Sequence, residues 1–327
     1  MPDGPGPGEV LVRLKAVGLC GSDLHWWNEG NIHGTPAAYP QILGHEPVGE
    51  IVETGPGVQG LEAGSRVSIE PSLTCGHCEF CLSGRHNLCA TSRFMGGPQA
   101  AGFLQDYRVV PAHNCDPIPA ELTWRQATLM EPVAVWVHIY ELAPVKMRQT
   151  VVVLGCGSIG LLGVAMAKAA GAGMILACDK APHRLEMARR LGADVALEAG
   201  WGDFEDAVMQ ATRGRGADVV YDAAGAPETI HLGIQCAKSG GDFVLIGIPE
   251  PLRFEVDLHT AMAKELRLQM IKRSNHKGRA AGALLASGQI PTSIITHRLP
   301  LAAAQQGFEM LYDRADGVGK LVFDMDL

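Results

Sequence analysis

The second half of the chain alternates short apolar runs with amphipathic stretches, which is the pattern of strands separated by helices. Strands are predicted at residues 150–154, 174–178, 194–197, 218–221, 243–246 and 266–271, and helices at 159–170, 182–191, 204–212 and 228–237. A strand that is apolar at nearly every position is buried on both faces, and a helix between consecutive strands makes them parallel. The pattern therefore predicts a doubly wound α/β domain.

The first 125 residues carry a different pattern, in which short apolar runs are separated by connections rich in proline and glycine. The runs lie at residues 9–16, 49–53, 66–69 and 104–110. This spacing is typical of a small antiparallel barrel or sandwich. Beyond Lys272 the chain holds one predicted helix, 278–286, and one strand, 320–323, too few for a domain. We expect a first domain of residues 1–132 completed by 272–327, and a second of 133–271.

Length, composition and charge narrow the range of partners. A chain of 327 residues with 47% apolar residues can bury two cores. The net charge is −8 and no basic patch opposes it, so the surface would repel nucleic acid and anionic membranes. The N-terminus has no signal-peptide pattern, and the apolar stretch 161–178 is interrupted by Lys168, as in a buried helix and strand. We expect a cytoplasmic protein without nucleic-acid or membrane partners.

A glycine-rich turn follows the first strand of the second half and opens a helix. It reads Gly155-Cys156-Gly157-Ser158-Ile159-Gly160. Such a turn lets the backbone approach a pyrophosphate, and the helix N-terminus presents free N–H groups to the anion. Asp179, 19 residues after Gly160, ends the next strand, where a carboxylate accepts ribose hydroxyls and repels a 2′-phosphate. The pattern predicts an NAD site; the alternative is a purely structural turn.

Two basic residues near Asp179 weaken the preference for NAD over NADP. They are Lys180 and Arg184. We interpret them as solvated charges or as contacts to the adenosine.

Four of the nine cysteines fall within fifteen residues. They are Cys75, Cys78, Cys81 and Cys89. Without an export signal, thiols stay reduced, so this clustering favours a metal over disulfides. Four thiolates suit tetrahedral zinc and leave no open position, which is typical of a structural site. The alternatives are an iron–sulfur cluster or unligated buried thiols.

A second set of possible ligands is scattered along the chain. It comprises Cys20 in GLCGSD, His45 and Glu46 in GHEP, and Glu131 in EPVA. Cysteine, histidine and carboxylate around one zinc leave a position for water or a substrate oxygen. Taken singly each is weak evidence, because a lone cysteine is usually core and His–Glu pairs are frequent on surfaces. Spacing alone does not join Cys20 to Glu131.

These motifs occur in one order and together resemble the zinc-dependent medium-chain dehydrogenase/reductase family. The strings are GLCGSDLH, GHEPVGEIVETG, the four-cysteine lobe, MEPVAV and GCGSIG. The match looks best to the polyol branch (sorbitol or iditol, xylitol and L-idonate dehydrogenases), with threonine dehydrogenase close by. Enzymes of the simple-alcohol branch usually carry a cysteine in place of Glu131. The resemblance implies a GroES-like β-barrel catalytic domain, a Rossmann domain, two zinc ions per chain, NAD, and a homodimer or homotetramer.

The resemblance also implies roles for the scattered residues. The implied ligands of a catalytic zinc are Cys20, His45 and one of Glu46 and Glu131, the other glutamate holding the bound water. The metal would stabilise an alkoxide, so that hydride leaves its carbon for the nicotinamide. Ser22 would relay the proton and His25 pass it on, unless His25 is a hydrogen-bonded structural histidine. Asp23 is expected to orient this loop.

Further positions would bind the nicotinamide half or the substrate. Ala224, Gly247 and Ile248 end later strands, where the nicotinamide half should lie. Trp26 stands where the polyol branch commonly has tyrosine, which counts against a sorbitol-like substrate. Arg273 falls where polyol relatives have an arginine followed shortly by asparagine, so it would bind substrate hydroxyls or a carboxylate, or belong to a surface basic run.

The implied function is oxidation of a secondary alcohol of a polyol, sugar or sugar acid with NAD as acceptor. One rival is a simple-alcohol or L-threonine dehydrogenase. Another is a non-catalytic nucleotide-binding relative, against which the intact set of predicted zinc and proton-relay residues speaks.

Overall fold

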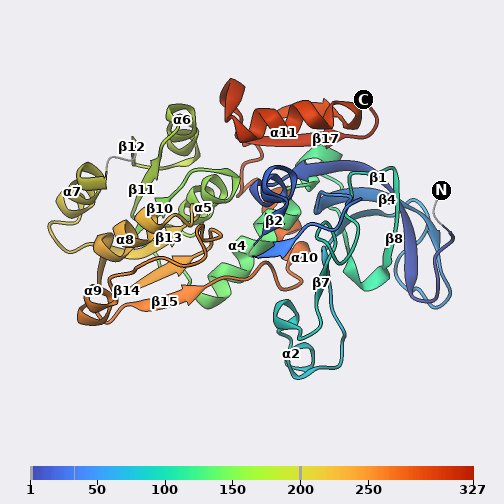
Figure 1. Ribbon diagram of the computed structural model, residues 1–327, viewed down its shortest axis with the longest axis horizontal. Coiled ribbons are helices and arrows are strands. Elements are labelled where there is room, and N and C mark those ends of the chain that lie inside the picture. Colours follow the sequence, from blue (N-terminus) through green and yellow to red (C-terminus); the bar gives the residue numbers. More distant parts are fainter. Residues whose placement is uncertain (1–2, 33, 199–200) are drawn as a thin grey trace. The chain divides into compact units, whose positions relative to one another are not determined.

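The computed structural model describes residues 3–32, 34–198 and 201–327, and Figure 1 traces the chain. Packing divides the chain into two compact units. The first is Met1–Val137 with Arg273–Gly288 and Ile295–Leu327, and the second is His138–Lys272 with Gln289–Ile294. Within the described residues, no helix is both long and apolar enough to cross a membrane.

The second unit is built on a six-stranded parallel sheet, ordered β12-β11-β10-β13-β14-β15. The strands are β10 (Thr150–Leu154), β11 (Met174–Asp179), β12 (Val195–Glu198), β13 (Ala217–Asp222), β14 (Ala237–Leu245) and β15 (Arg267–Met270). The predicted doubly wound sheet is confirmed. Because the chain fills β11 and β12 on one side of β10 before crossing to β13, the topology switches between β10 and β13, where such sheets bind ligands.

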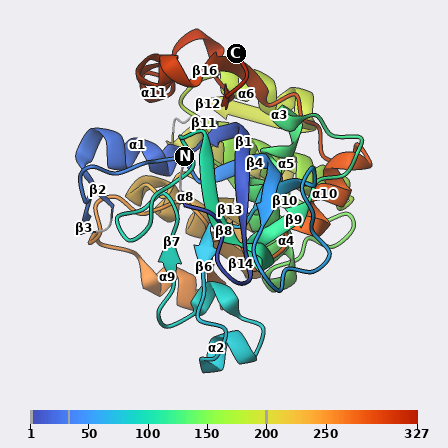
Figure 2. The ribbon, with the colours of Figure 1, turned by 90° about the vertical axis from the view of Figure 1, so that its right-hand side faces the viewer.

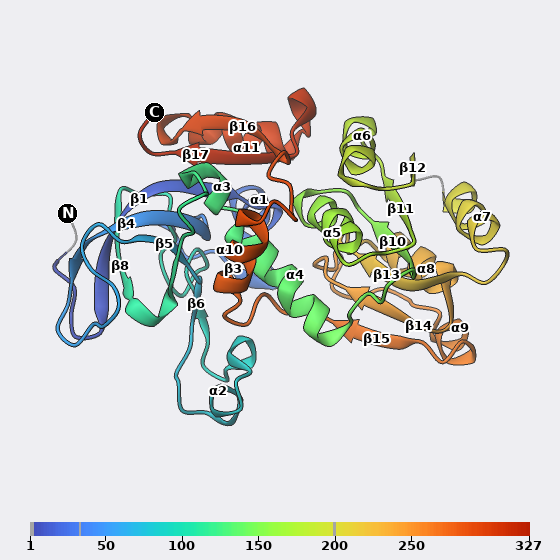
Figure 3. The ribbon, with the colours of Figure 1, turned by 180° about the vertical axis from the view of Figure 1, so that it is seen from behind.

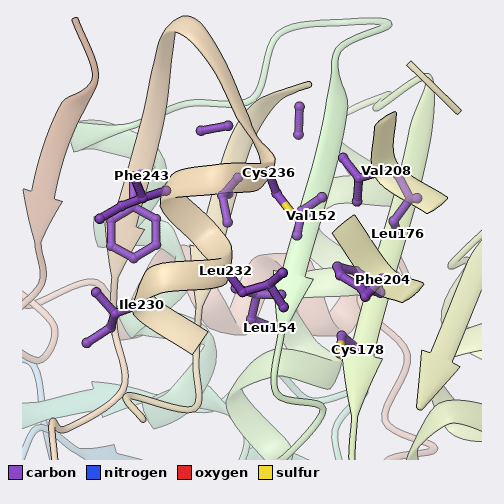
Figure 4. Packing of buried hydrophobic residues seen from close by; sticks show 14 of the residues in the cluster. Val152, Leu154, Leu176, Cys178, Phe204, Val208, Ile230, Leu232, Cys236 and Phe243 are labelled. Atoms are coloured by element: carbon purple, nitrogen blue, oxygen red, sulfur yellow. The ribbon is translucent and has the colours of Figure 1, made fainter. Parts of the chain in front are cut away.

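Helices cover this sheet and connect its strands. They are α5 (Ser158–Ala169), which opens just after the end of β10 (Figure 3), α6 (Pro182–Leu191), α7 (Trp201–Ala211), α8 (Pro227–Cys236) and α9 (Leu258–Ala263). Val152 and Leu154 pack with Phe204 of α7 and Ile230 of α8 in one core (Figure 4). The alternate residue Val153 is equally buried on the opposite face. Both faces are therefore covered, which is why these strands are apolar throughout.

The first unit is built on a mostly antiparallel sheet, ordered β16-β17-β1-β4-β5-β9, with β8 also pairing β1 (Figure 3). The strands are β1 (Glu9–Leu19), β4 (Glu46–Thr54), β5 (Arg66–Ile69), β8 (Tyr107–Pro111), β9 (Cys115–Pro117), β16 (Ile295–Pro300) and β17 (Lys320–Asp324). Only β16 and β17 pair in parallel. β17 pairs antiparallel with β1, so the end of the chain is part of this sheet.

The remaining helices, turns and short strands complete the described chain. They are α1 (Gly21–Leu24), the π-helical turn η1 (His25–Glu29), β2 (Asn31–Ile32), β3 (Thr35–Pro36), β6 (Ser72–Leu73), α2 (Glu79–Leu82), η2 (His86–Leu88), β7 (Arg93–Phe94), η3 (Ala112–Asn114), α3 (Trp124–Ala127), α4 (Met130–Leu142), α10 (Gly278–Ala286), η4 (Leu301–Ala303), α11 (Ala304–Tyr312) and η5 (Ala315–Gly317). The pair β6–β7 carries a lobe with α2 that projects from the sheet of the first unit (Figures 1 and 2).

Several strands of the first unit differ from their predicted bounds. β1 continues three residues beyond the predicted 9–16, β4 begins at Glu46 rather than at 49, and the strand predicted at 104–110 is reduced to β8. The pairing of β1 with β4 shifts register twice, between Leu11 and Val12 and between Leu14 and Ala16. Such bulges break the two-residue period from which strand ends are read.

Candidate functional site

Four cysteines gather in the lobe carried by β6 and β7. Cys78 is the N-cap of α2 and Cys81 lies within it, while Cys75 precedes the helix and Cys89 follows η2. Their sulfur atoms all lie within 4.8 Å of one another, and the Cys75 and Cys81 sulfurs are 4.0 Å apart. A sulfur tetrahedron at the usual Zn–S distance has edges of roughly 3.8 Å. All four thiols are free of disulfides, so the donor set fits a structural zinc ion.

Backbone N–H groups point at sulfurs of this lobe. The Cys75 N–H lies 3.3 Å from Cys89 Sγ and lowers the pKa of that thiol. The N–H groups of Ala90 and Cys81 lower the pKa of Cys78 to about 6, whereas burial raises that of Cys81 to about 11. Because the thiolate is the form that binds metal, the turn favours ligation at Cys78 and Cys89.

Cys20, His45 and Glu46 come together from two neighbouring strands. Cys20 follows β1 and, with an extended backbone, forms the N-cap of α1. His45 and Glu46 lie at the start of β4, where Glu46 is paired with Gly18 of β1. The ligand atoms of the three residues lie within 4.8 Å of one another, and His45 and Glu46 are buried. The structure thus brings together three of the four predicted ligands of the catalytic ion.

A buried carboxylate fixes the histidine of this group. Asp23 Oδ1 lies 3.2 Å from His45 Nδ1 and accepts the Gly44 N–H, while Oδ2 accepts the Cys20 N–H, both at 3.1 Å. Holding Nδ1 leaves Nε2 of His45 for a metal. Burial alone would raise the pKa of Asp23 and lower that of His45, but their attraction reverses both shifts.

A lysine from the C-terminal strand holds Glu46. Lys320 of β17 is fully buried, and its Nζ donates to Glu46 Oε1 at 2.5 Å. Glu46 Oε2 lies 2.5 Å from the same nitrogen, so both carboxylate oxygens are ion-paired with Lys320. It lies against Gly18, where a side chain would collide with it. A carboxylate oxygen has more than one lone pair and can also bind a metal, so the thiol, imidazole and carboxylate together form a donor set that fits a zinc ion.

Glu131, near the start of α4, lies outside that group of three but interacts electrostatically with His45 and Glu46. Burial raises the pKa of Glu131 to about 8, with His45 opposing and Glu46 adding to the shift. Lys320 opposes it as well. A second carboxyl group therefore lies near these residues without joining the group of three.

Arg273 lies close to His45, with the ring of Phe94 in contact with both. Its guanidinium lies 3.9 Å from the centre of the Phe94 ring, and His45 contacts the same ring, at 5.1 Å between centroids. Burial lowers the pKa of Arg273, and Glu70 opposes that shift. The backbone of Arg273 is left-handed, with φ of 59°, a strained conformation for an arginine. The next residue, Ser274, donates to Glu70 and anchors the segment.

The predicted proton-relay residues differ in their surroundings. Ser22 Oγ lies 3.5 Å from His45 Nε2, beside the nitrogen left for the metal. His25 Nδ1 lies 3.0 Å from Glu29 Oε1, one turn along η1, so that ring is already engaged in a local pair. Trp26 is only 8% exposed, and its carbonyl accepts from Tyr39 Oη at 3.4 Å.

In the second unit, the predicted dinucleotide turn has glycine where a side chain would collide. Gly155 has φ of 85°, and a Cβ there would lie 2.9 Å from Ala224 Cβ. A Cβ at Gly160 would strike the Gly155 carbonyl. At Gly157 the nearest atom would be Arg184 Nη1, 4.0 Å away, so space remains above this backbone. Ser158 and Ile159 form the first turn of α5, whose N-cap is Gly157.

Asp179 and Asp222 tie the strand ends of this unit together. Asp179 accepts the Cys156 N–H at 2.6 Å and the Ala181 N–H at 2.8 Å, one on each oxygen. Each oxygen keeps a second lone pair for a ribose hydroxyl. The Asp222 carboxylate accepts hydrogen bonds from the N–H groups of Ala224 and Gly225, at 2.9 and 3.0 Å. The backbone carbonyl of Asp222 accepts a hydrogen bond from the N–H group of Gly247. The predicted residues Ala224, Gly247 and Ile248 thereby share one edge, with Ile248 against Gly225.

Three residues of the first-unit site escaped the sequence analysis: Glu70, Phe94 and Lys320. Glu70 ends an apolar strand, and Lys320 opens the apolar run KLVF. A charge beside or within an apolar run signals a buried partner, because such charges are buried only when paired. Nothing local distinguishes Phe94, whose role depends on contacts with distant residues.

Comparison with known proteins covers both units. Residues 6–120 match the family model described as alcohol dehydrogenase GroES-like domain. Residues 158–287 match the family model described as zinc-binding dehydrogenase. A protein named probable D-xylulose reductase A, from Arthroderma otae, is 36% identical over 327 residues, covering 97% of this chain and 90% of that protein. The sorbitol dehydrogenase of Bacillus subtilis is 33% identical over 302 residues, covering 92% and 86%.

A solved structure agrees with these relatives. An alcohol dehydrogenase from E. coli CFT073, described as short chain and complexed with NADH, has a TM-score of 0.91. It is 28% identical and the match covers 99% of this chain and 94% of that one.

Proposed function

The chain belongs to the zinc-dependent medium-chain dehydrogenase/reductase family, in its polyol branch, and we propose that it oxidises a secondary alcohol of a polyol, sugar or sugar acid with NAD. The observation that carries this proposal is the buried group of Cys20, His45 and Glu46, with a second carboxyl, Glu131, facing it. A thiolate, an imidazole and a carboxylate make an open zinc site, as a catalytic metal requires.

Residues of the first unit would bind the zinc ion and carry away the proton of the substrate hydroxyl. Zinc, when bound, supplies a Lewis acid that makes a substrate hydroxyl more acidic. Asp23 keeps His45 in the orientation that exposes Nε2. Ser22 Oγ beside it would take up the hydroxyl proton while giving its own proton to His25, which would release it to solvent. Of the two glutamates, Glu46 is favoured as the ligand because its oxygen lies among the other donors. Glu131 then holds the water or the substrate hydroxyl.

Arg273 is proposed as a substrate-binding residue. Its half-buried guanidinium, stacked on Phe94 beside His45, keeps its donors for hydroxyl or carboxylate oxygens of the substrate. Trp26 adds apolar bulk rather than a hydroxyl, which suits a substrate with fewer polar contacts on that side than sorbitol makes.

The second unit's residues would hold NAD, which when bound accepts the hydride at its nicotinamide ring. The backbone at Gly157 and the N-terminus of α5 would hold the pyrophosphate, and Asp179 would accept the ribose hydroxyls. The carboxylate of Asp179 would disfavour the 2′-phosphate of NADP, while Arg184, near Gly157, would bind the adenosine half. Ala224, Gly247 and Ile248 would line the nicotinamide end.

A substrate panel on metal-quantified protein tests the proposal. We expect NAD reduction with polyols such as sorbitol and xylitol or with aldonates, at a higher kcat/KM than with ethanol or L-threonine. A higher value for L-threonine or a primary alcohol would assign one of those activities instead. Zinc near one ion per chain with no turnover on any alcohol would favour a non-catalytic nucleotide-binding relative.

We further propose that the protein is a cytoplasmic homo-oligomer, a dimer or tetramer. β15 is an edge strand of the parallel sheet, and Leu268 and Met270 on it are 39% and 58% exposed. Met262 on the preceding helix is 70% exposed. An apolar sheet edge is a template for a second copy of the same strand. All nine cysteines are free, which suits the reducing cytoplasm.

A further inference from the structure

A cavity of about 390 Å³ in the first unit lies outside the predicted catalytic residues. Its lining residues are Thr74, Cys75, Gly76, His86, His113 and His276. The three histidines come from three separate segments, namely η2, η3 and the loop before α10. Half of the lining is therefore imidazole, which the proposed dehydrogenase reaction does not use.

The three rings have no hydrogen bonds to satisfy them. Among the described residues, none of their nitrogens has a hydrogen-bond or ion-pair partner, and the one ring contact is between His86 and His276, edge to face at 4.8 Å between centroids. Burial lowers the pKa of His113 and of His276, and the neighbouring histidines lower them further. Neutral imidazoles offer lone pairs to a metal and little attraction to an anion.

The charges around the cavity also favour a cation. The negative charges of Glu70 and Asp116 both act to raise the pKa of His276, that is, they favour a positive charge at this ring. Asp116 also forms an ion pair with Arg279, with 3.4 Å between Asp116 Oδ1 and Arg279 Nε. A donor set of imidazoles selects ions of the zinc, nickel and copper class over calcium or magnesium, which prefer oxygen.

We propose that this cavity binds a divalent transition-metal ion through His86 and His276, whose rings are in contact, with water in the remaining positions. Unlike the two groups described above, these three side chains do not have all their nitrogens within 4.8 Å of one another. The ion therefore keeps several waters and exchanges readily. Because Cys75 lines the same cavity, the histidines act as an acquisition site for the cysteine lobe, a step that rests on the proposed structural zinc and not on the alcohol oxidised.

Metal titration of the protein already loaded with its two zinc ions tests the site. Isothermal titration with Ni²⁺ should reveal one further ion per chain. His86→Ala and His276→Asn should each weaken it at least about tenfold, equivalent to ~1.4 kcal/mol, and the double variant should abolish it. Asparagine is chosen at His276 because φ there is 53°, a conformation that asparagine tolerates.

The matched control is His297→Ala, since that half-buried ring on β16 lies away from the cavity and is hydrogen-bonded to Thr296. It should leave the third ion in place. Absence of a third ion, or a third ion equally tight in both cavity variants, would overturn the proposal. If the double variant fails to fold, the two single variants decide by the same tenfold criterion.

The acquisition role has its own readout, which uses no turnover. Labelled zinc should exchange into the cysteine lobe more slowly in the double variant than in the unmodified protein, with the same final zinc content. An unchanged exchange rate would refute acquisition. Neither readout changes if the substrate proposed above proves wrong.

Discussion

At the scale of single residues, three buried aspartates organise the two proposed sites by accepting backbone N–H groups. Asp23 holds the Cys20 and Gly44 backbones, Asp179 holds the glycine-rich turn, and Asp222 holds the later strand ends. Each carboxylate thereby fixes a loop that side-chain packing alone would leave free, because hydrogen bonds to a charged group are about twice as strong as neutral ones. Asp23 does more than the loop orientation expected of it, since it also binds the ring of His45.

A residue-scale prediction concerns the choice of coenzyme. Asp179→Asn keeps the shape of the side chain and one carbonyl acceptor but removes the negative charge. The ratio of kcat/KM for NAD to that for NADP should fall at least about tenfold, because the variant no longer repels a 2′-phosphate. Asp194→Asn, on the next strand connection, is the control. An unchanged ratio would show that Asp179 serves only the turn.

At the scale of elements, the last strand of the chain completes the sheet and reaches the candidate metal ligands. β17 pairs with β1 and carries Lys320 to Glu46 across 274 positions of sequence. Breaking a buried ion pair leaves an uncompensated charge, which costs more than the pair itself contributes.

Lys320→Met should therefore lower the free energy of unfolding by about 3–5 kcal/mol. The loss should be smaller in the double variant Glu46→Gln/Lys320→Met, which removes both charges. Denaturant unfolding of the three proteins measures this, with Lys15→Met, at the partly exposed pair with Asp326, as the control. Equal losses in single and double variants would mean that Lys320 acts through packing alone.

A second ionic link joins strands of the parallel sheet. Burial alone would raise the pKa of Asp218, but hydrogen bonds from Arg215 and Lys238 and from the Thr150 N–H lower it to about 2. A lowered carboxyl pKa stabilises the fold above the unfolded value near 3.9, and this stability is lost as the pH falls through about 2.

Asp218→Asn should accordingly reduce the free energy of unfolding by ~2 kcal/mol at neutral pH. The difference from the unmodified protein should vanish towards pH 2, because the native carboxylate is then protonated as well. Urea unfolding at several pH values checks this. A difference that stays constant with pH would point to shape rather than charge.

The elements also show what the sequence could and could not predict. β10 and β11 were predictable because a strand buried on both faces is apolar throughout, which is a local signal. The prediction for β1 ended too early because bulges break its two-residue period. β16 was missed because polar residues interrupt its apolar positions, whereas α11 was missed although Phe308 and Leu311 lie on one buried face. The group of Cys20 and His45 depended on a resemblance, since no local pattern encodes a contact between two strands. For Lys320 the charge at the start of an apolar run was a local signal, but no local pattern identifies Glu46 as its partner.

At the scale of the whole molecule, the apolar edge at β15 links the fold to assembly. An exposed edge strand with Leu268 and Met270 on it is an aggregation hazard unless something covers it. A second copy of the chain would cover it and extend the sheet.

Leu268→Lys with Met270→Lys should convert the proposed oligomer into smaller species, because charges on an edge strand oppose edge-to-edge pairing. Light scattering after size exclusion measures the mass. Leu82→Lys, at a 76% exposed position in the cysteine lobe, is the control and should not change it. A mass unaffected by the edge variant would place the interface elsewhere.

The proposed activity requires a catalytic zinc ion at Cys20, and metal content measured together with turnover tests this requirement most directly. Cys20→Ser should reduce zinc from two ions per chain to one and abolish NAD reduction with the best substrate, while NADH binding is retained. Cys115→Ser, at a buried thiol outside both metal groups, should keep both ions and the activity. Full zinc content and turnover in Cys20→Ser would contradict the proposed mechanism.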